Sequence, residues 1–198
     1  MSDTTFPDVL VFDVNETLLD ITTLSPLFSR VFGDESVLRE WFAQLVLYSQ
    51  TMTLSQRYTH FGALGVGALK MVADIHQVRL ADDDIDELKS RMAEMPAHPD
   101  VAPALERLKQ AGFRLVTLTN SPAGASPTPL EKAGISEAFE QHFSVDSVKQ
   151  FKPAPATYHV HDRLPCVGHH WCPGRRHAGR PADAPAQCRA ARRECAGP

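Results

Sequence analysis

The feature that most constrains the fold is an apolar run that ends on a carboxylate. Val9 to Phe12 (VLVF) lead directly into Asp13, which opens the stretch DVNETLLD. A short apolar run bounded by polar residues is typical of a buried strand in a parallel sheet, and open α/β sheets carry their chemistry at the carboxyl ends of such strands. The pattern therefore predicts that Asp13 lies at a functional edge, where its carboxylate can act as a nucleophile. A helix N-cap or a turn residue is the competing interpretation.

Two later segments repeat this arrangement. Residues 113–121 read FRLVTLTNS, an apolar strand that ends on Thr119, Asn120 and Ser121, and a third predicted strand, 139–145, leads to Phe151-Lys152-Pro153. Strands that alternate with helical segments indicate a parallel α/β sheet. Taken singly, the hydroxyl and amide residues are also compatible with a polar turn, and Lys152 with a solvated surface lysine.

Residues 22–95, between the first two strands, are predicted to be mostly helical. The acidic triplet 82–84 suits the start of a helix, and 61–69 is apolar but contains three glycines. Beyond this insert, the proline-containing loop 122–129 delays the next helix to about Leu130. Apolar residues recur at helical spacing in three segments: 37–48, 85–95 and 101–110.

The three motifs, in this order, resemble those of the haloacid dehalogenase superfamily, and the resemblance runs from about Asp8 to Tyr158. It implies a Rossmann-like catalytic core made of residues 1–20 and 96–158. It also implies a helical cap, residues 21–95, which closes over the active site and selects the substrate.

The resemblance also assigns roles to individual side chains. Asp13 would be the nucleophile, Thr17 would hydrogen-bond to it, and Lys152 would keep it ionised through charge proximity. The substrate's charged group would be bound by side chains that include the motif after the second strand and a tyrosine of the cap. These candidate substrate-binding residues are Asn15, Tyr48, Thr119, Asn120 and Ser121.

The residue two positions after the nucleophile distinguishes two chemistries. Phosphatases of the superfamily have a second Asp there, which protonates the leaving alkoxide and helps to hold Mg²⁺, whereas this chain has Asn15. An amide cannot act as a general acid, but a halide leaves as a stable anion and needs no proton. The sequence therefore favours a type II (L-2-haloacid) dehalogenase that hydrolyses an (S)-2-haloalkanoate through an aspartyl ester, with no metal or cofactor. The alternatives are a phosphatase-like hydrolase of the same superfamily, and an inactive chain that is either a binding or interaction protein or a truncated or frameshifted product.

The chain also departs from the dehalogenase pattern. Dehalogenases of this type usually have an aromatic residue at the position of Asn15, and an Arg directly after a cap Trp to receive the halide. Here Phe42 follows Trp41. Arg39 lies one helical turn before Phe42, where it either replaces the missing Arg or is an ordinary solvated side chain.

Residues 159–198 have a different composition from the rest of the chain. They carry seven Arg, no Lys, five of the nine His and all four Cys. Nothing after Val160 fits the last two strands and the motif IV acid that the family requires. A reading-frame error near Tyr158 is the favoured interpretation, and the alternatives are a zinc site and a disordered basic tail. In the family the strand order is 5-4-1-2-3, so the loss of strands four and five would leave the first strand as an uncovered apolar edge. We therefore expect poor solubility and impaired activity.

The overall composition excludes several classes of partner. The net charge of −4 offers no basic face for nucleic acid, and no apolar stretch approaches the roughly 18 residues of a membrane span. The first residues lack the basic and apolar regions of a signal peptide. We expect a cytoplasmic enzyme with a small-molecule substrate, a 2-haloacid, and from the resemblance a homodimer.

Overall fold

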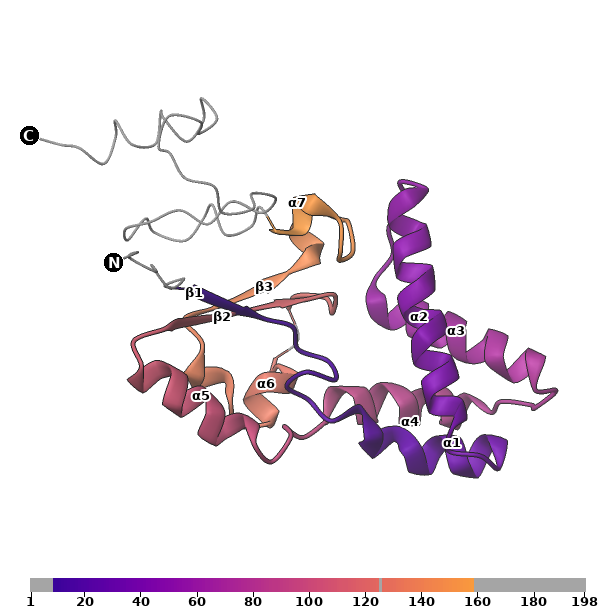
Figure 1. Cartoon of the computed structure of the whole chain (residues 1–198). Helices are drawn as coiled ribbons and strands as arrows, with labels where there is room; N and C mark the ends of the chain where they lie inside the picture. Colours follow the sequence, from indigo (N-terminus) through magenta and orange to yellow (C-terminus); the bar gives the residue numbers. More distant parts are fainter. Residues whose placement is uncertain (1–8, 125, 159–198) are drawn as a thin grey trace, which may run out of the picture.

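A three-stranded parallel sheet forms one part of the molecule. The computed structural model describes residues 9–124 and 126–158, and in them the strands β1 (Val9–Phe12), β2 (Arg114–Thr119) and β3 (Gln141–Ser144) lie side by side in the order β1-β2-β3 (Figure 1). Phe12 is opposite Thr117, and Thr119 is opposite Ser144. The predicted parallel α/β sheet is confirmed, and all three strands end at the same edge.

The burial of the strands follows from their order in the sheet. The inner residues of the central strand, 115–118, are all buried, which explains why three of the four are apolar. Among the described residues β1 pairs only with β2, and Val11 is 45 % exposed. Within that part of the chain β1 is therefore an edge strand, as expected. The last two strands that the family requires would follow Val160, which lies outside the described residues.

Short helices support the sheet. α5 (Val101–Gln110) lies where the sequence predicts it and buries Val101 and Leu105, and both α5 and α6 (Pro129–Lys132) lie on the same side of the sheet (Figure 1). α6 begins at Pro129 rather than at Leu130, because proline is tolerated at the first helical position and Thr128 caps the helix. The remaining short elements are the 3₁₀ helices η2 (Ser136–Ala138) and η3 (Val145–Ser147) and the helix α7 (Pro155–Tyr158).

Four helices make up a second part, which we call the helical unit. After the 3₁₀ turn η1 (Ile21–Leu24) come α1 (Ser25–Phe32), α2 (Val37–Leu54), α3 (Phe61–Ile75) and α4 (Asp82–Ala93) (Figure 1). Trp41 of α2 is fully buried, and its Nε1–H donates to the backbone oxygen of Gly65 in α3 at 2.9 Å. No helix in the described residues is long and apolar enough to cross a membrane.

Two of these helices extend beyond the segments that the sequence predicts. α2 continues six residues beyond Tyr48, and α3 continues to Ile75 despite its glycines, because Leu69, Val72 and Ala73 extend its buried face. α4 starts at the acidic triplet, as the sequence predicts, and the carboxylates there meet the positive end of the helix dipole. The extensions of α2 and α3 reflect tertiary packing, which the apolar periodicity of the sequence does not reveal by itself.

The chain crosses between the sheet and the helical unit twice, and the two crossings are hydrogen-bonded to each other. The N–H of Asp20 donates to the oxygen of Pro96 at 2.8 Å, and the N–H of His98 donates to the oxygen of Leu18 at 3.0 Å. Leu19, which is fully buried, forms an antiparallel bridge with Ala97. The helical unit therefore joins the sheet through a short paired linker.

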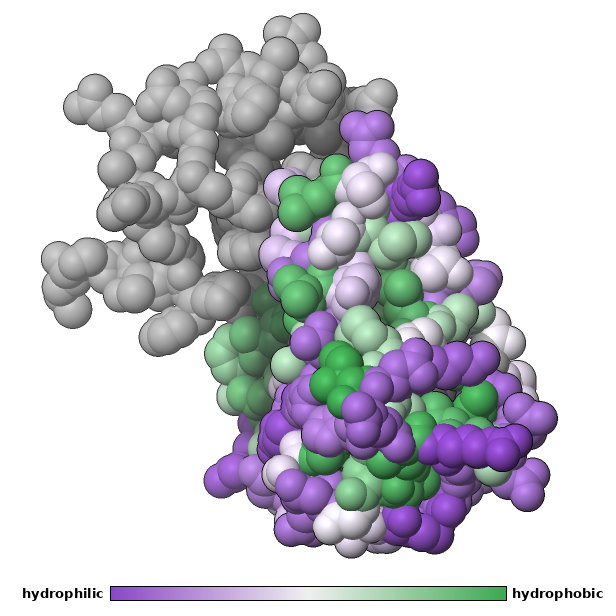
Figure 2. Space-filling model, turned by 90° about the vertical axis from the view of Figure 1, so that its right-hand side faces the viewer, coloured by the Kyte–Doolittle hydropathy of each residue, from purple (hydrophilic) through white to green (hydrophobic). Residues whose placement is uncertain are grey.

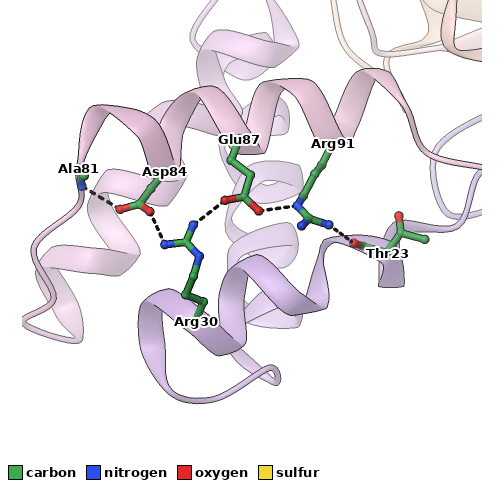
Figure 3. A network of polar contacts seen from close by, with 6 residues as sticks. All are labelled: Thr23, Arg30, Ala81, Asp84, Glu87 and Arg91. Atoms are coloured by element: carbon green, nitrogen blue, oxygen red, sulfur yellow. Dashed lines mark hydrogen bonds and ion pairs between the residues drawn. The ribbon is translucent and has the colours of Figure 1, made fainter.

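A polar network holds α1 against α4 (Figure 3). The guanidinium of Arg30 donates to Asp84 at 2.8 Å and to Glu87 at 2.5 Å. Arg91 donates to Glu87 at 2.6 Å and to the backbone oxygen of Thr23 at 3.2 Å. Asp84 also accepts the N–H of Ala81 at 2.8 Å, which caps the first turn of α4.

This network makes the fold sensitive to acid. The hydrogen bond from the Ala81 N–H, and after it the contact with Arg30, hold the pKa of Asp84 below its ordinary value. The hydrogen bonds from Arg91 and Arg30 lower the pKa of Glu87 in the same way. Both groups bind a proton less readily in the folded chain than in the unfolded one. Their contribution to stability is therefore complete above the ordinary carboxyl pKa of about 4 and is lost as the pH falls through the lowered values.

We predict that Asp84→Asn lowers the free energy of unfolding at pH 7 by about 1 to 2 kcal/mol, because the amide loses the ion pair and one of two acceptor oxygens. Urea unfolding at pH 7, and again in steps below pH 5, measures this and should show a weaker acid dependence in the variant. The matched control is Asp86→Asn in the same helix, whose side chain is 73 % exposed and pairs with Lys89. Equal stabilities for the two variants would contradict the prediction.

Candidate active site

The carboxyl ends of the three strands bring distant parts of the chain to one edge of the sheet. Asp13 follows β1, Asn120 and Ser121 follow β2, and Asp146 lies two residues after the end of β3. Because the strands are parallel and in register, these turns are neighbours in space. The edge is a candidate active site.

Asp13 lies at this edge, directly after β1. Its Oδ2 accepts a hydrogen bond from the Thr17 hydroxyl at 3.2 Å, and its Oδ1 accepts one from the Lys152 ammonium. The ammonium donates a second bond to the backbone oxygen of Leu118 at 2.7 Å. The Asp13 side chain is 47 % exposed and that of Lys152 only 16 %, so the carboxylate is open to a reactant while its counter-charge lies beneath it.

A compact turn after β1 places Thr17 beside Asp13. The N–H groups of Leu18 and Leu19 both donate to the oxygen of Val14, at 2.9 and 3.0 Å, and all three of these side chains are buried. Glu16 lies at the outer point of the turn, with φ at +69°, in the left-handed region that non-glycine residues seldom adopt. The buried anchors hold the turn in this conformation.

The loop after β2 is tied to both of the other motifs. Asn120 Oδ1 accepts the N–H of Lys152 at 2.9 Å, and the Ser121 hydroxyl accepts the side-chain amide of Asn15 at 3.3 Å. Thr119 Oγ1 accepts the N–H of Ser121 at 3.0 Å. The structure thus brings together Asn15, Asn120 and Ser121 around Asp13 and Lys152, and orders Thr119 at the same edge.

The candidates on α2 differ in position. Tyr48 lies on α2 with 41 % of its surface exposed, and no hydrogen bond within the described residues joins it to this cluster. Arg39 is not simply solvated: its guanidinium contacts the carboxylate of Glu16, three residues after Asp13, although its side chain remains 64 % exposed. Phe42 is partly buried against Trp41.

Sequence reasoning did not select two residues that the structure places near this edge. The Tyr58 hydroxyl, from the loop between α2 and α3, donates to Asp146 Oδ1, and the N–H of Ala123 donates to Asp146 Oδ2 at 3.0 Å. Burial would raise the pKa of Asp146, but the bonds from Tyr58 and Ala123 and the nearby charges of Lys149 and His60 outweigh it, so that the pKa is lowered. Burial, together with the same carboxylate, raises the pKa of Tyr58. The position of Asp146 just after a predicted strand could have identified it from the sequence, whereas no sequence pattern distinguishes Tyr58.

The described residues contain no group of three or more His, Cys, Asp or Glu side chains that could hold a metal ion. The zinc interpretation and the expected lack of a motif IV acid both concern residues 159–198, which lie outside the described part of the chain.

Comparisons with known proteins agree with this geometry. The family model for haloacid dehalogenase-like hydrolases matches residues 7–160. Among curated proteins, (S)-2-haloacid dehalogenase 1 of Pseudomonas sp. (strain CBS-3) is 32 % identical over 150 residues, which are 75 % of this chain and 66 % of that protein. (S)-2-haloacid dehalogenase 4A of Burkholderia cepacia is 29 % identical over 150 residues, which are 75 % of this chain and 65 % of that protein.

A similar structure has also been solved. A crystal structure of an L-2-haloacid dehalogenase aligns with a TM-score of 0.75 and 27 % identity, and covers 80 % of this chain and 73 % of that one. The chain spans about two thirds of the length of the curated relatives that it matches, at 66 % and 65 %. With a matching family model over most of its length, the chain belongs to the haloacid dehalogenase-like hydrolases.

Proposed function

We propose that this site hydrolyses the carbon–halogen bond of an (S)-2-haloalkanoate and releases a halide and a 2-hydroxy acid. The observation that carries the proposal is the half-exposed Asp13 carboxylate, held between Lys152 and Thr17, with an amide rather than an acid at Asn15. The names of the curated relatives, (S)-2-haloacid dehalogenases, support the same reaction.

In the first step an Asp13 carboxylate oxygen attacks C2 of the substrate. A C–O bond forms while the carbon–halogen bond breaks, and the halide leaves with the bonding electron pair. Lys152 and Thr17 orient the carboxylate, which reduces the entropic cost of reaching the attack geometry. Since the halide leaves as an anion, no proton donor is needed, and this agrees with the amide at Asn15.

In the second step water attacks the carbonyl carbon of the Asp13 ester. The bond between this carbon and the ester oxygen breaks, and the Asp13 carboxylate is restored with one oxygen from water. One proton of the water passes to the leaving oxygen, which becomes the hydroxyl of the departing 2-hydroxy acid, and the other is released to solvent. The Lys152 ammonium lies on the Asp13 carboxyl group, where it can stabilise the negative charge that develops on the carbonyl oxygen.

The loop after β2 presents donors suited to the substrate carboxylate. Because Asn120 Oδ1 accepts the Lys152 N–H, its amide NH₂ remains to donate, and because Thr119 Oγ1 accepts the Ser121 N–H, its hydroxyl hydrogen remains as well. Ser121 and Asn15 complete this group. Tyr48 is the contact that we propose from α2.

We propose that residues 21–95 act as a cap over a core made of residues 1–20 and 96–158. The paired linker between residues 18–20 and 96–98 supports this division, because both crossings of the chain lie together there.

We also propose that the protein forms a homodimer and is cytoplasmic. The apolar side chains exposed on α2 and α3 support the homodimer: Leu47 (53 %), Leu54 (84 %) and Ile75 (60 %). Figure 2, which views the helical side of the molecule, shows apolar residues gathered among polar ones.

We predict that Asp13→Asn lowers halide release from L-2-chloropropionate by at least about 1,000-fold, since the amide is a poor nucleophile and the ester cannot form. Halide release by the purified 198-residue chain, measured with a chloride electrode, tests this. The control is Asp100→Asn, because Asp100 is an exposed residue at the start of α5 whose side chain makes no capping bond. Substantial release by Asp13→Asn would sink the assignment of the nucleophile.

The same preparations separate the alternatives. A phosphatase-like hydrolase would release phosphate from p-nitrophenyl phosphate in a Mg²⁺-dependent manner and release no halide. An inactive, truncated product would release neither phosphate nor halide. The proposal requires halide release that is unchanged by a chelator.

A second prediction concerns Arg39, which we propose to receive the departing halide in place of an Arg at position 42. Arg39→Gln should lower kcat/KM for halide release about 10-fold, the effect of losing a hydrogen bond to a charged group. It should leave the melting temperature nearly unchanged, because an exposed ion pair contributes little stability.

The matched control is Arg57→Gln, which removes an exposed guanidinium three residues beyond the end of α2. Glu16→Gln, which releases Arg39 from its carboxylate, should not reduce kcat/KM as Arg39→Gln does. If Arg39→Gln behaved like Arg57→Gln, Arg39 would be a surface residue without a role in the reaction.

A further inference from the structure

We infer that Asp146 is a positioning residue that couples the helical unit to the loop after β2. The inference rests on the proposed function, in which that loop binds the substrate carboxylate. Asp146 itself does not contact Asp13 or Lys152 in the structure; it acts through the residues that it holds.

The Asp146 carboxylate joins three segments of the chain. Its Oδ1 accepts the hydroxyl of Tyr58 and lies 3.5 Å from the ring of His60, both in the loop between α2 and α3. Its Oδ2 accepts the N–H of Ala123, in the loop after β2, at 3.0 Å. The Lys149 ammonium, which belongs to the same segment as Asp146, lies 3.5 Å away. The Asp146 side chain is only 15 % exposed, so these contacts replace most of its hydration.

A second set of bonds ties the turn around Asp146 to the same loop. The Ser144 hydroxyl donates to the backbone oxygen of Ser121 at 2.7 Å and accepts the N–H of Asp146 at 3.1 Å. Together with the bond to Ala123, this holds the loop at two points that are two residues apart. The loop's position relative to Asp13 therefore depends on the turn that Asp146 organises.

The Tyr58 side of the contact reaches the segment that carries Lys152. The Tyr58 ring stacks on Phe151 with centroids 5.0 Å apart, and Phe151 is fully buried. The N–H of Phe151 donates to the Thr53 hydroxyl on α2 at 2.9 Å. The Lys149 ammonium lies over the Tyr58 ring, 4.8 Å from its centroid. Movement of the α2–α3 loop would thus displace both the loop after β2 and the segment next to Lys152.

The chemistry of this position requires a carboxylate. Two donors, the Tyr58 hydroxyl and the Ala123 N–H, point at different oxygens, and an amide offers only one acceptor oxygen for them. Asp146→Asn removes the charge from both contacts and leaves one acceptor oxygen for two donors, so both the Tyr58 and the Ala123 bonds should weaken. Tyr58→Phe removes only the hydroxyl and keeps the ring on Phe151, so that it isolates the coupling from the packing.

The test measures the loop directly, by hydrogen exchange of the peptide that contains residues 119–124 in the full chain. Asp146→Asn should accelerate exchange of the Ala123 amide at least about 10-fold, since a bond to a charged acceptor is lost. Tyr58→Phe, a change in the helical unit, should accelerate it about 3-fold or more through the weakened hold on Asp146. Asp86→Asn, on the exposed face of α4, is the control and should leave exchange as in the wild type.

Kinetics supplies the second measurement. Tyr58→Phe and Asp146→Asn should each lower kcat/KM for halide release about 10-fold. Their melting temperatures should lie within a few degrees of that of Asp86→Asn. Since both act through one contact, the double variant should be no worse than Asp146→Asn alone. A purely structural role would instead lower stability in proportion to the loss of activity.

Exchange and kinetics in Tyr58→Phe that match the control, or effects that add in the double variant, would overturn the inference. If the wild-type chain released no halide at all, the proposed reaction would fail. The exchange results would then still decide whether Asp146 couples the two parts.

Discussion

The contact between the Lys152 ammonium and the Asp13 carboxylate is the interaction on which the site depends. The ammonium is largely buried, and a charge in that position requires both a counter-charge and hydrogen-bond acceptors, which Asp13 and the backbone oxygen of Leu118 supply. To bring these partners together, β1 must end at Asp13, β2 must lie beside it with Leu118 near its end, and the segment after β3 must return across the same edge. The parallel register of the sheet is thus a requirement of the site as well as of the core.

The site also lies where the two parts of the molecule meet. The paired linker around Leu19 and Ala97 carries the chain into the helical unit and back, while the α2–α3 loop returns to the sheet through Tyr58. Thr53 on α2 accepts the N–H of Phe151, next to Lys152, and Arg39 on α2 contacts Glu16, next to the turn that holds Thr17. Three separate contacts therefore join α2 and its following loop to the motifs around Asp13, so the arrangement of the helical unit bears on the geometry of the site.

Local patterns in the sequence were sufficient for the sheet and for the residues around Asp13. An apolar run that stops on a polar residue predicts both a strand and the edge of the sheet at which polar side chains gather, and Asp13 and the stretch 119–121 lie at that edge in the structure. The lengths of α2 and α3 were not predictable in this way, because tertiary burial extends both helices past the points where periodicity weakens. The contacts Tyr58–Asp146 and Arg39–Glu16 join residues far apart in sequence, and no local pattern encodes such pairs.

The central claim is that Asp13 forms a covalent ester, and one isotope measurement tests it directly. A single turnover is run in H₂¹⁸O with the protein in excess over L-2-chloropropionate, and the peptide containing Asp13 and the 2-hydroxy acid are then weighed by mass spectrometry. Water attacks the carbonyl carbon of the ester in this account, so ¹⁸O should appear in Asp13 while the hydroxyl of the product carries an unlabelled oxygen from the protein. An ¹⁸O-labelled product with unlabelled Asp13 would show direct attack of water on C2 and would contradict the account.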